Sequence, residues 1–282
     1  FMETYCLSDA GIRAFACHLQ QREKAPGTIE AYCRGVSAFA RWLGDAPAQP
    51  GSAAAWKAHL ADAGYAPATI NCMLIALNCF FRFAGRPQFG ARLLRVQRRA
   101  FRDARRELTR ADYDRLLDAA RRAGRKRLAL LLETICATGI RVSELRYITC
   151  EAVRRGRAEI SLKGKVRTIL LPGRLCRKLE KFARRQRISA GEIFRTKSGR
   201  GIGRRQVWAE MKALCRLAGV AASKVYPHNL RHLFARTFYR ASHDIAMLAD
   251  VLGHSSIDTT RIYLIATGAE HARQIDRLGL VT

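Results

Sequence analysis

Residues 157–172 read RAEISLKGKVRTILLP and decide the fold class. Two short runs rich in β-branched and apolar residues, RAEISL and VRTILLP, flank the tripeptide Lys163-Gly164-Lys165. A glycine between two such runs is typical of the turn of a β-hairpin. The other segments with a clear hydrophobic period have the helical one. The sequence therefore predicts a mainly α chain in which one small β-hairpin forms part of an α+β domain.

The first part of the chain shows helical patterns alone. Asp9 can cap a helix that runs to about Glu23, and Pro26-Gly27-Thr28 ends it and begins the next. Two further helical patterns cover residues 53–64 and 67–85, each of which closes on a glycine. Four helices in so short a segment predict a small helical bundle.

A strongly basic stretch follows the bundle. Residues 92–110, RLLRVQRRAFRDARRELTR, hold eight arginines against two acidic residues. Because this stretch lies where the helical pattern ends, we interpret it as a linker that crosses a phosphate backbone. The predicted organisation is a helical DNA-binding domain over 1–94, a basic linker over 95–107 and a second domain over 108–282. The linker arginines expected to contact DNA are Arg98, Arg99, Arg105 and Arg106.

The second domain combines the hairpin with further helices. Thr109 and Asp112 form a capping-box pattern before a helix that ends near residue 124. A buried helix follows and stops at Gly139, and another is expected to begin at Arg141. After the hairpin, helical patterns cover 203–219, 228–242, 243–254 and 256–267.

The net charge indicates the class of partner. The chain has 51 Lys and Arg against 23 Asp and Glu, a net charge of +28, and residues 96–282 carry +24 of it. So large an excess usually meets a polyanion, which favours nucleic acid. No apolar run approaches the length of a membrane span, and the N-terminus FMETYCLSDA lacks the basic head and apolar core of a signal peptide. We expect a cytoplasmic protein without a membrane partner.

Several chemistries are excluded by missing motifs. Nine scattered cysteines without a C-x-x-C pair predict reduced, mostly buried thiols. His228 and His232 are four residues apart, but no further ligand lies at zinc spacing, so no metal site is expected. Phosphate-loop, dinucleotide-binding, G-x-S-x-G and H-E-x-x-H motifs are absent. The sequence predicts no cofactor.

Basic side chains and one tyrosine remain as candidates for chemistry. Arg141, in TGIR, stands at a predicted helix start, where a guanidinium suits a phosphate. His228 and Arg231, in PHNLRH, are three residues apart and share one helix face. LGH ends a predicted helix at His254, and Tyr263 follows nine residues later within an apolar helix.

Four motifs in this order, TGIRVSEL, PHNLRH, LGH and TTRIY, resemble the tyrosine recombinase (phage integrase) family. The similarity covers nearly the whole chain, because KAPGTIEAYCRGVSAFARWLG resembles the core-binding domain of that family. The resemblance implies a four-helix SAM-like core-binding domain and a catalytic domain that together form a C-clamp around duplex DNA. It also implies strand transfer through a covalent 3′-phosphotyrosyl intermediate and a Holliday junction, without metal or ATP.

The resemblance assigns a role to each matching residue. Two arginines neutralise the charge that builds on the phosphate oxygens, and a proton donor serves the leaving 5′-oxygen. Lys163 matches that donor, with Lys165 as the alternative, whereas His232 is expected to be structural. The expected catalytic residues are the nucleophile Tyr263, the phosphate-clamping Arg141 and Arg231, the general acid/base His228, the second histidine His254 and the donor Lys163, supported by Glu144, with Lys165 also counted among the DNA contacts.

The compact length resembles Xer-like recombinases, which implies a homotetramer on an inverted-repeat DNA site and a monomer in its absence. Residues beyond Tyr263 carry a short apolar stripe, which docks either on its own domain or, as we favour, on a neighbouring protomer. Integration, excision, inversion and dimer resolution are all compatible with the sequence. Two alternatives are a type IB topoisomerase and a catalytically inactive DNA-binding regulator.

Overall fold

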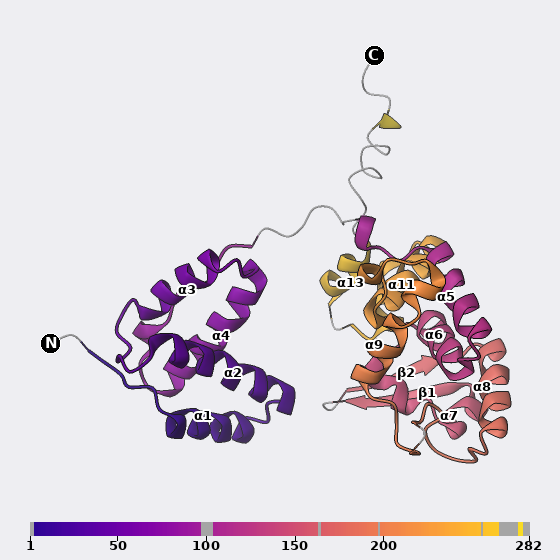
Figure 1. Cartoon of the computed structure of the whole chain (residues 1–282), viewed down its shortest axis with the longest axis horizontal. Coiled ribbons are helices and arrows are strands. Elements are labelled where there is room, and N and C mark those ends of the chain that lie inside the picture. Colours follow the sequence, from indigo (N-terminus) through magenta and orange to yellow (C-terminus); the bar gives the residue numbers. More distant parts are fainter. Residues whose placement is uncertain are drawn as a thin grey trace. The chain divides into compact units, whose positions relative to one another are not determined.

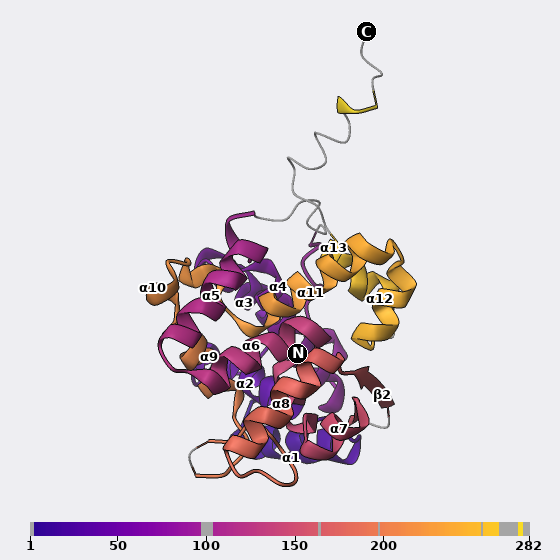
Figure 2. The ribbon, with the colours of Figure 1, turned by 90° about the vertical axis from the view of Figure 1, so that its right-hand side faces the viewer.

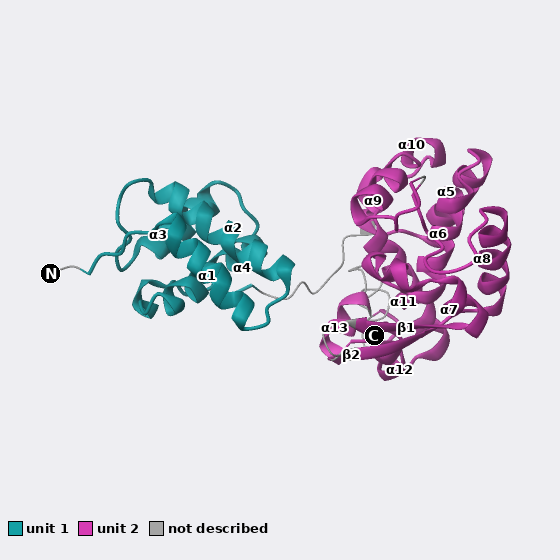
Figure 3. Ribbon diagram, turned by 90° about the horizontal axis from the view of Figure 1, so that it is seen from below, with its two compact units in different colours: residues 1–98 teal, residues 99–282 magenta. Residues whose placement is uncertain are grey.

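The computed structural model describes residues 3–96, 104–162, 165–196, 198–254, 256–264 and 276–278 (Figure 1). The chain divides into two compact units, residues 1–98 and 99–282 (Figure 3). Within the described residues the fold is mainly helical with one two-stranded sheet, as predicted. None of the described helices has the length and apolar character that crossing a bilayer requires.

Unit 1 consists of the predicted helical bundle. Its helices are α1 (Asp9–Gln21), α2 (Pro26–Leu43), α3 (Ser52–Asp62) and α4 (Pro67–Phe83), followed by the short 3₁₀ helix η1 (Pro87–Phe89). Proline at the first position of α2 and α4 fixes a helical φ where no backbone donor is needed. The predicted cap at Asp9 is wrong, because the Ser8 hydroxyl accepts a hydrogen bond from the Gly11 amide at 3.1 Å.

Aromatic side chains fill the core of unit 1. Phe15 meets Phe80 edge to face with ring centroids 5.4 Å apart, and Phe39 meets Trp56 at 5.2 Å. All four side chains are buried. Such pairs add to the free energy gained by burial, so unit 1 has a hydrophobic core of its own.

The chain that leaves unit 1 is held against α4 up to its last described residues. Asn71 exchanges two hydrogen bonds with the backbone of Leu94, at 2.9 and 2.8 Å. Two of the predicted linker arginines, Arg98 and Arg99, lie outside the described residues. The other two, Arg105 and Arg106, are exposed on the 3₁₀ helix η2 (Ala104–Arg106).

Unit 2 contains the hairpin and the remaining helices, with α6 at its centre (Figure 2). α6 is apolar almost all round and packs against α5, α8, α9 and α11. Its elements are α5 (Arg110–Arg122), α6 (Lys126–Thr138), η3 (Val142–Tyr147), α7 (Cys150–Arg155), β1 (Arg157–Leu162), β2 (Lys165–Leu170), α8 (Gly173–Arg185), α9 (Arg204–Lys212), α10 (Cys215–Ala218), η4 (Ala222–Lys224), α11 (Pro227–Ser242), α12 (Ile245–Leu252) and α13 (Ile257–Leu264).

Local patterns in unit 2 agree with the structure in most places. The capping box is confirmed, since Thr109 and Asp112 exchange two hydrogen bonds of 3.1 Å. The helix predicted from Arg141 is a short 3₁₀ helix, because the Glu144 amide bonds to the carbonyl three residues earlier. The single helix predicted over 203–219 is interrupted, and α9 and α10 form instead.

The predicted hairpin is confirmed. β1 and β2 are antiparallel, with Leu162 opposite Lys165 and Ile160 opposite Arg167. The turn residues 163 and 164, and the side chain of Lys165, lie outside what the structure describes. Ile169 is buried, whereas its neighbour Leu170 is exposed. Since alternate residues share a face, Arg167 lies on the buried face with Ile169.

The expectation of mostly buried thiols is wrong. All nine cysteines are free, but only Cys150, Cys176 and Cys215 are buried. Three others, Cys6, Cys17 and Cys72, are exposed in unit 1, where aromatic rings already fill the core. Burial raises the pKa of the half-buried Cys136 thiol, which packs against the core of unit 2, to about 12.

Candidate active site

Arg231 is the centre of the candidate site. It lies on α11 and is 1% exposed. Its Nη1 donates to the carbonyl of Gly139 and its Nη2 to that of Leu252, at 2.8 Å. Its Nε donates to Tyr263 Oη at 3.3 Å, and Nη2 lies 2.9 Å from His254 Nε2. One buried guanidinium therefore joins α11 to the ends of α6 and α12 and to α13.

The positive charge of Arg231 is held by backbone dipoles. Gly139 and Leu252 are at the C-terminal ends of α6 and α12, where helix dipoles place negative potential. Burial lowers the pKa of Arg231 to about 10, so the group stays protonated at neutral pH. Two helix ends thus take the place of a carboxylate partner.

Gly139 is the residue that this arrangement requires. Its φ of +63° lies in the left-handed region that favours glycine. A Cβ at this position would lie 2.4 Å from Cδ1 of Phe234 on α11. The glycine of TGIR thus lets α6 end close to α11, where its carbonyl accepts from Arg231.

His254 is held between two partners. Its Nε2 lies 2.9 Å from Arg231 Nη2 and its Nδ1 2.9 Å from Thr260 Oγ1. Because a guanidinium only donates, Nε2 must accept, and the proton is on Nδ1. Burial and the charge of Arg231 lower the pKa of His254 to about 4. The imidazole is therefore neutral at physiological pH.

The low pKa of His254 predicts acid sensitivity. The unfolded histidine has a pKa near 6.5, so between pH 6.5 and 4 the unfolded chain binds more protons than the folded one. The contribution of His254 to the free energy of unfolding should therefore be constant above pH 6.5 and decrease as the pH drops toward 4. His254→Asn should lose less stability over this window, as measured by urea unfolding. His243→Asn, which changes an exposed histidine at the end of α11, should keep the wild-type pH dependence.

Tyr263 is 5% exposed and lies among three imidazole rings. His254 stacks on it with centroids 5.5 Å apart, and His228 lies at 5.6 Å. His232, which was expected to be structural, lies nearer still at 4.4 Å. The spacing of PHNLRH placed His232 on α11, but only the packing of α13 brings the tyrosine against it.

Arg141 and Glu144 form the second part of the site. Arg141 donates to Glu144 through its amide at 2.8 Å and its Nη1 at 3.0 Å. Glu144 is 1% exposed, whereas the Arg141 side chain is 41% exposed. The buried carboxylate thus fixes the position of Arg141, and the N–H groups of Arg141 on the exposed side remain accessible to an anion. Arg141 also lies close enough to help lower the pKa of His254.

The structure brings most of the predicted residues together. Lys163 lies outside the described residues. Among the described residues, no group of three His, Cys, Asp or Glu could hold a metal ion. Sequence reasoning missed Arg167, whose Nη2 donates to Glu144 at 2.5 Å. The residues that gather around one point are Arg141, Glu144, His228, Arg231, His254 and Tyr263.

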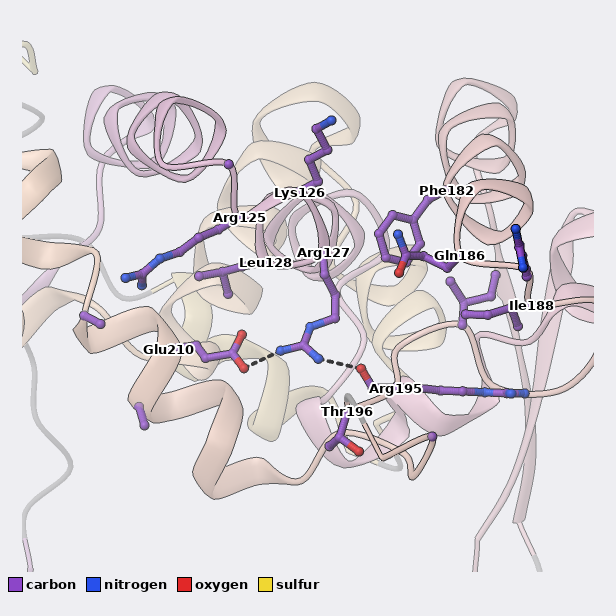
Figure 4. A pocket seen from close by; sticks show the side chains of 16 residues that line it. Arg125, Lys126, Arg127, Leu128, Phe182, Gln186, Ile188, Arg195, Thr196 and Glu210 are labelled. Atoms are coloured by element: carbon purple, nitrogen blue, oxygen red, sulfur yellow. Dashed lines mark hydrogen bonds and ion pairs between the residues drawn. The ribbon is translucent and has the colours of Figure 1, made fainter.

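A pocket elsewhere in unit 2 contains none of these residues (Figure 4). It lies between the start of α6, the end of α8 and α9, and basic side chains such as Lys126 line it. Arg127 spans the pocket, pairing with Glu210 and donating to the Arg195 carbonyl. This hollow is separate from the candidate site.

Comparisons with known proteins identify the family of the chain. The model of the phage integrase family matches residues 106–269, and that of its N-terminal SAM-like domain matches residues 12–88. The chain belongs to the phage integrase family. It is therefore a tyrosine-type site-specific recombinase, an enzyme that cuts and rejoins DNA.

Relatives of this integrase-family enzyme span most of its length. The tyrosine recombinase XerA of Thermococcus kodakarensis is 32% identical, with 93% of each chain covered. XerD of Brucella suis is 32% identical over 86% of this chain and 88% of its own. A lambda integrase tetramer bound to a Holliday junction has the same fold, with a TM-score of 0.72 and 20% identity over 93% of this chain and 77% of that one.

Proposed function

We propose that Tyr263 Oη attacks a DNA phosphodiester held by Arg141 and Arg231. The phosphorus–tyrosyl oxygen bond forms, the bond to the 5′-oxygen breaks, and a 3′-phosphotyrosyl ester and a 5′-hydroxyl result. Religation reverses these steps, and exchange of strands passes through a Holliday junction. The observation that carries the proposal is the 3.3 Å contact between Tyr263 Oη and Arg231 Nε within one chain.

The two arginines supply different donors. Arg231 is enclosed, and its Nε donates to the tyrosine hydroxyl. When that oxygen bonds to phosphorus, Nε is placed to donate to a non-bridging phosphate oxygen. Arg141 approaches from the accessible side with its outer donors. Together they oppose the negative charge of the pentacoordinate transition state.

Two residues, His228 and Lys163, are assigned to proton transfer. Tyr263 must lose a proton to attack, and His228, exposed on the first turn of α11, is the base we assign. His254, neutral and fixed by Thr260, positions the tyrosine by stacking. Lys163 protonates the leaving 5′-oxygen.

A suicide substrate tests the proposed chemistry. A DNA site is first selected from random sequence by binding, then nicked so that the short 5′-hydroxyl fragment diffuses away after cleavage. The enzyme should form a covalent adduct in EDTA, and peptide mass spectrometry should place the DNA on Tyr263. No adduct, or an adduct on another tyrosine, would refute the assignment.

The hairpin lysine gives a second prediction. Lys163→Ala should cleave ordinary DNA slowly, because the leaving alkoxide then lacks its acid. On a 5′-bridging phosphorothiolate the thiolate leaves without a proton, so cleavage should recover. Lys165→Ala is the matched control. Recovery in Lys165→Ala instead of Lys163→Ala would move the acid to residue 165.

The basic linker gives a third prediction. The logarithm of DNA affinity should fall with the logarithm of salt by roughly 0.9 for each phosphate contacted. Replacing the linker arginines Arg98, Arg99, Arg105 and Arg106 by glutamine should flatten this slope and retain the preferred site. The same four positions changed to lysine keep the charge and should keep the slope. A shallow slope in the wild type would show that these arginines do not bind phosphates.

The proposed reaction also has a consequence for the oligomeric state of the protein. The lambda integrase that shares this fold is a tetramer on a Holliday junction. We infer a cytoplasmic protein that is monomeric alone and forms a homotetramer on paired inverted-repeat DNA sites. The C-terminal apolar stripe, which except for residues 276–278 lies outside the described residues, is assigned to docking on a neighbouring protomer.

A further inference from the structure

Arg167 is a largely enclosed cation to which the proposed reaction assigns no role. It lies on β2 and its side chain is 15% exposed. Its Nη2 donates to Glu144 at 2.5 Å, and its Nη1 donates to the carbonyl of Leu252. Burial lowers its pKa, and the Glu144 carboxylate opposes that change. The guanidinium therefore has fixed partners on both sides.

Each partner of Arg167 also holds a proposed catalytic arginine. Glu144 accepts two hydrogen bonds from Arg141 and one from Arg167. The Leu252 carbonyl accepts from Arg231 as well as from Arg167. Because one rigid planar group contacts both acceptors, it fixes the distance between them.

The glycine of LGH provides the space for Arg167. Gly253 has a φ of +65°, and a Cβ there would lie 2.3 Å from Cδ of Arg167 and 2.7 Å from its Nη1. The turn that carries His254 therefore rests directly on the Arg167 side chain. Arg167 thus contacts the support of Arg141, the support of Arg231 and the turn before His254.

We infer that Arg167 is a positioning residue that holds the side chains of Arg141, Arg231 and His254 in the relative positions that cleavage requires. The inference rests on the proposed function of those residues. Arg231 donates to the hydroxyl of the proposed nucleophile Tyr263, whereas the hydrogen bonds of Arg167 go to Glu144 and to the Leu252 carbonyl, so we assign Arg167 no contact with the phosphate. It acts through Glu144 and through the Leu252 carbonyl.

Arg167→Lys is the sharpest test. Lysine keeps the charge but has a single ammonium group, which cannot span the two acceptors in the same geometry. Misplacement of the catalytic groups by about 1 Å can slow a reaction by about 10²-fold. We expect the single-turnover rate of adduct formation to fall by about that factor, with half-site affinity and melting temperature near wild type.

The fold should survive this change because other contacts anchor the hairpin. Ile160 and Ile169 remain buried, and Tyr147 Oη still donates to the Ser161 carbonyl at 2.8 Å. Arg157→Lys, an exposed arginine of β1, is the matched control and should cleave at the wild-type rate. Circular dichroism and half-site binding check that each variant is folded.

A double-mutant cycle identifies the route. If Arg167 acts through Glu144, the variant carrying both Arg167→Lys and Glu144→Gln should cleave little more slowly than Glu144→Gln alone. Rate losses that multiply would overturn this route, and a wild-type rate in Arg167→Lys would overturn the inference. Failure of the wild type to form an adduct would instead refute the proposed function, so the two failures are distinct.

Discussion

Tyr263→Phe is expected to bind its DNA site and to form no covalent adduct. The phenol oxygen is the only atom removed, and it is the nucleophile in the proposed reaction. Its loss also removes the acceptor of the Arg231 Nε bond, so the free energy of unfolding should fall by about 1–3 kcal/mol. Denaturing gels of the suicide-substrate reaction measure the adduct, and urea unfolding measures the stability.

Tyr239→Phe is the matched control for this variant. Tyr239 is half-buried on α11, where its ring contacts His243 and packs against the apolar cluster that also includes Tyr263, and removing its hydroxyl leaves this apolar packing in place. This variant should form adduct at the wild-type rate. Adduct that persists in Tyr263→Phe would show that another residue is the nucleophile.

Arg231→Lys is expected to slow cleavage by about 10³-fold at saturating enzyme, the upper range for loss of one preorganised donor. A lysine ammonium cannot bond the Gly139 and Leu252 carbonyls and still reach Tyr263. Single-turnover adduct formation on the suicide substrate measures the rate. The melting temperature should fall as well, because a buried carbonyl is left unpaired.

The control for Arg231→Lys is Arg216→Lys on α10. Arg216 is exposed in the last turn of that helix and lysine keeps its charge, so this substitution should leave both rate and stability unchanged. A rate within tenfold of wild type in Arg231→Lys would contradict the central role given to the buried guanidinium.

Periodic patterns predicted the elements of the fold well. Two runs rich in β-branched and apolar residues around Gly164 predicted the hairpin, and the Thr109 capping box predicted the start of α5, because both signals are local. The 3₁₀ helix after Arg141 was missed, since its form depends on the side chain of Glu144 and on the packing around it. Helix ends that depend on packing leave a weaker trace in the sequence.

The candidate site could be predicted only in part. The resemblance of four motifs to the phage integrase family pointed to the tyrosine, the arginines and the histidines. Arg167 reads as one of many arginines in the sequence, because its partner Leu252 is 85 residues away along the chain. The contact of His232 with Tyr263 likewise forms only when α13 packs on α11. Tertiary contacts of this kind have no periodic signature.

The carbonyls that hold Arg231 have a consequence for the resting enzyme. A carboxylate beside this guanidinium would compete with an incoming phosphate and would have to be displaced. Peptide dipoles carry no net charge and cannot dissociate, so they stabilise the cation without cancelling it. Glu144, the carboxylate that does contact the cluster, is buried beneath two guanidinium groups. The site is therefore electropositive before DNA binds, and a phosphate can approach Arg231 without first breaking an ion pair of that residue.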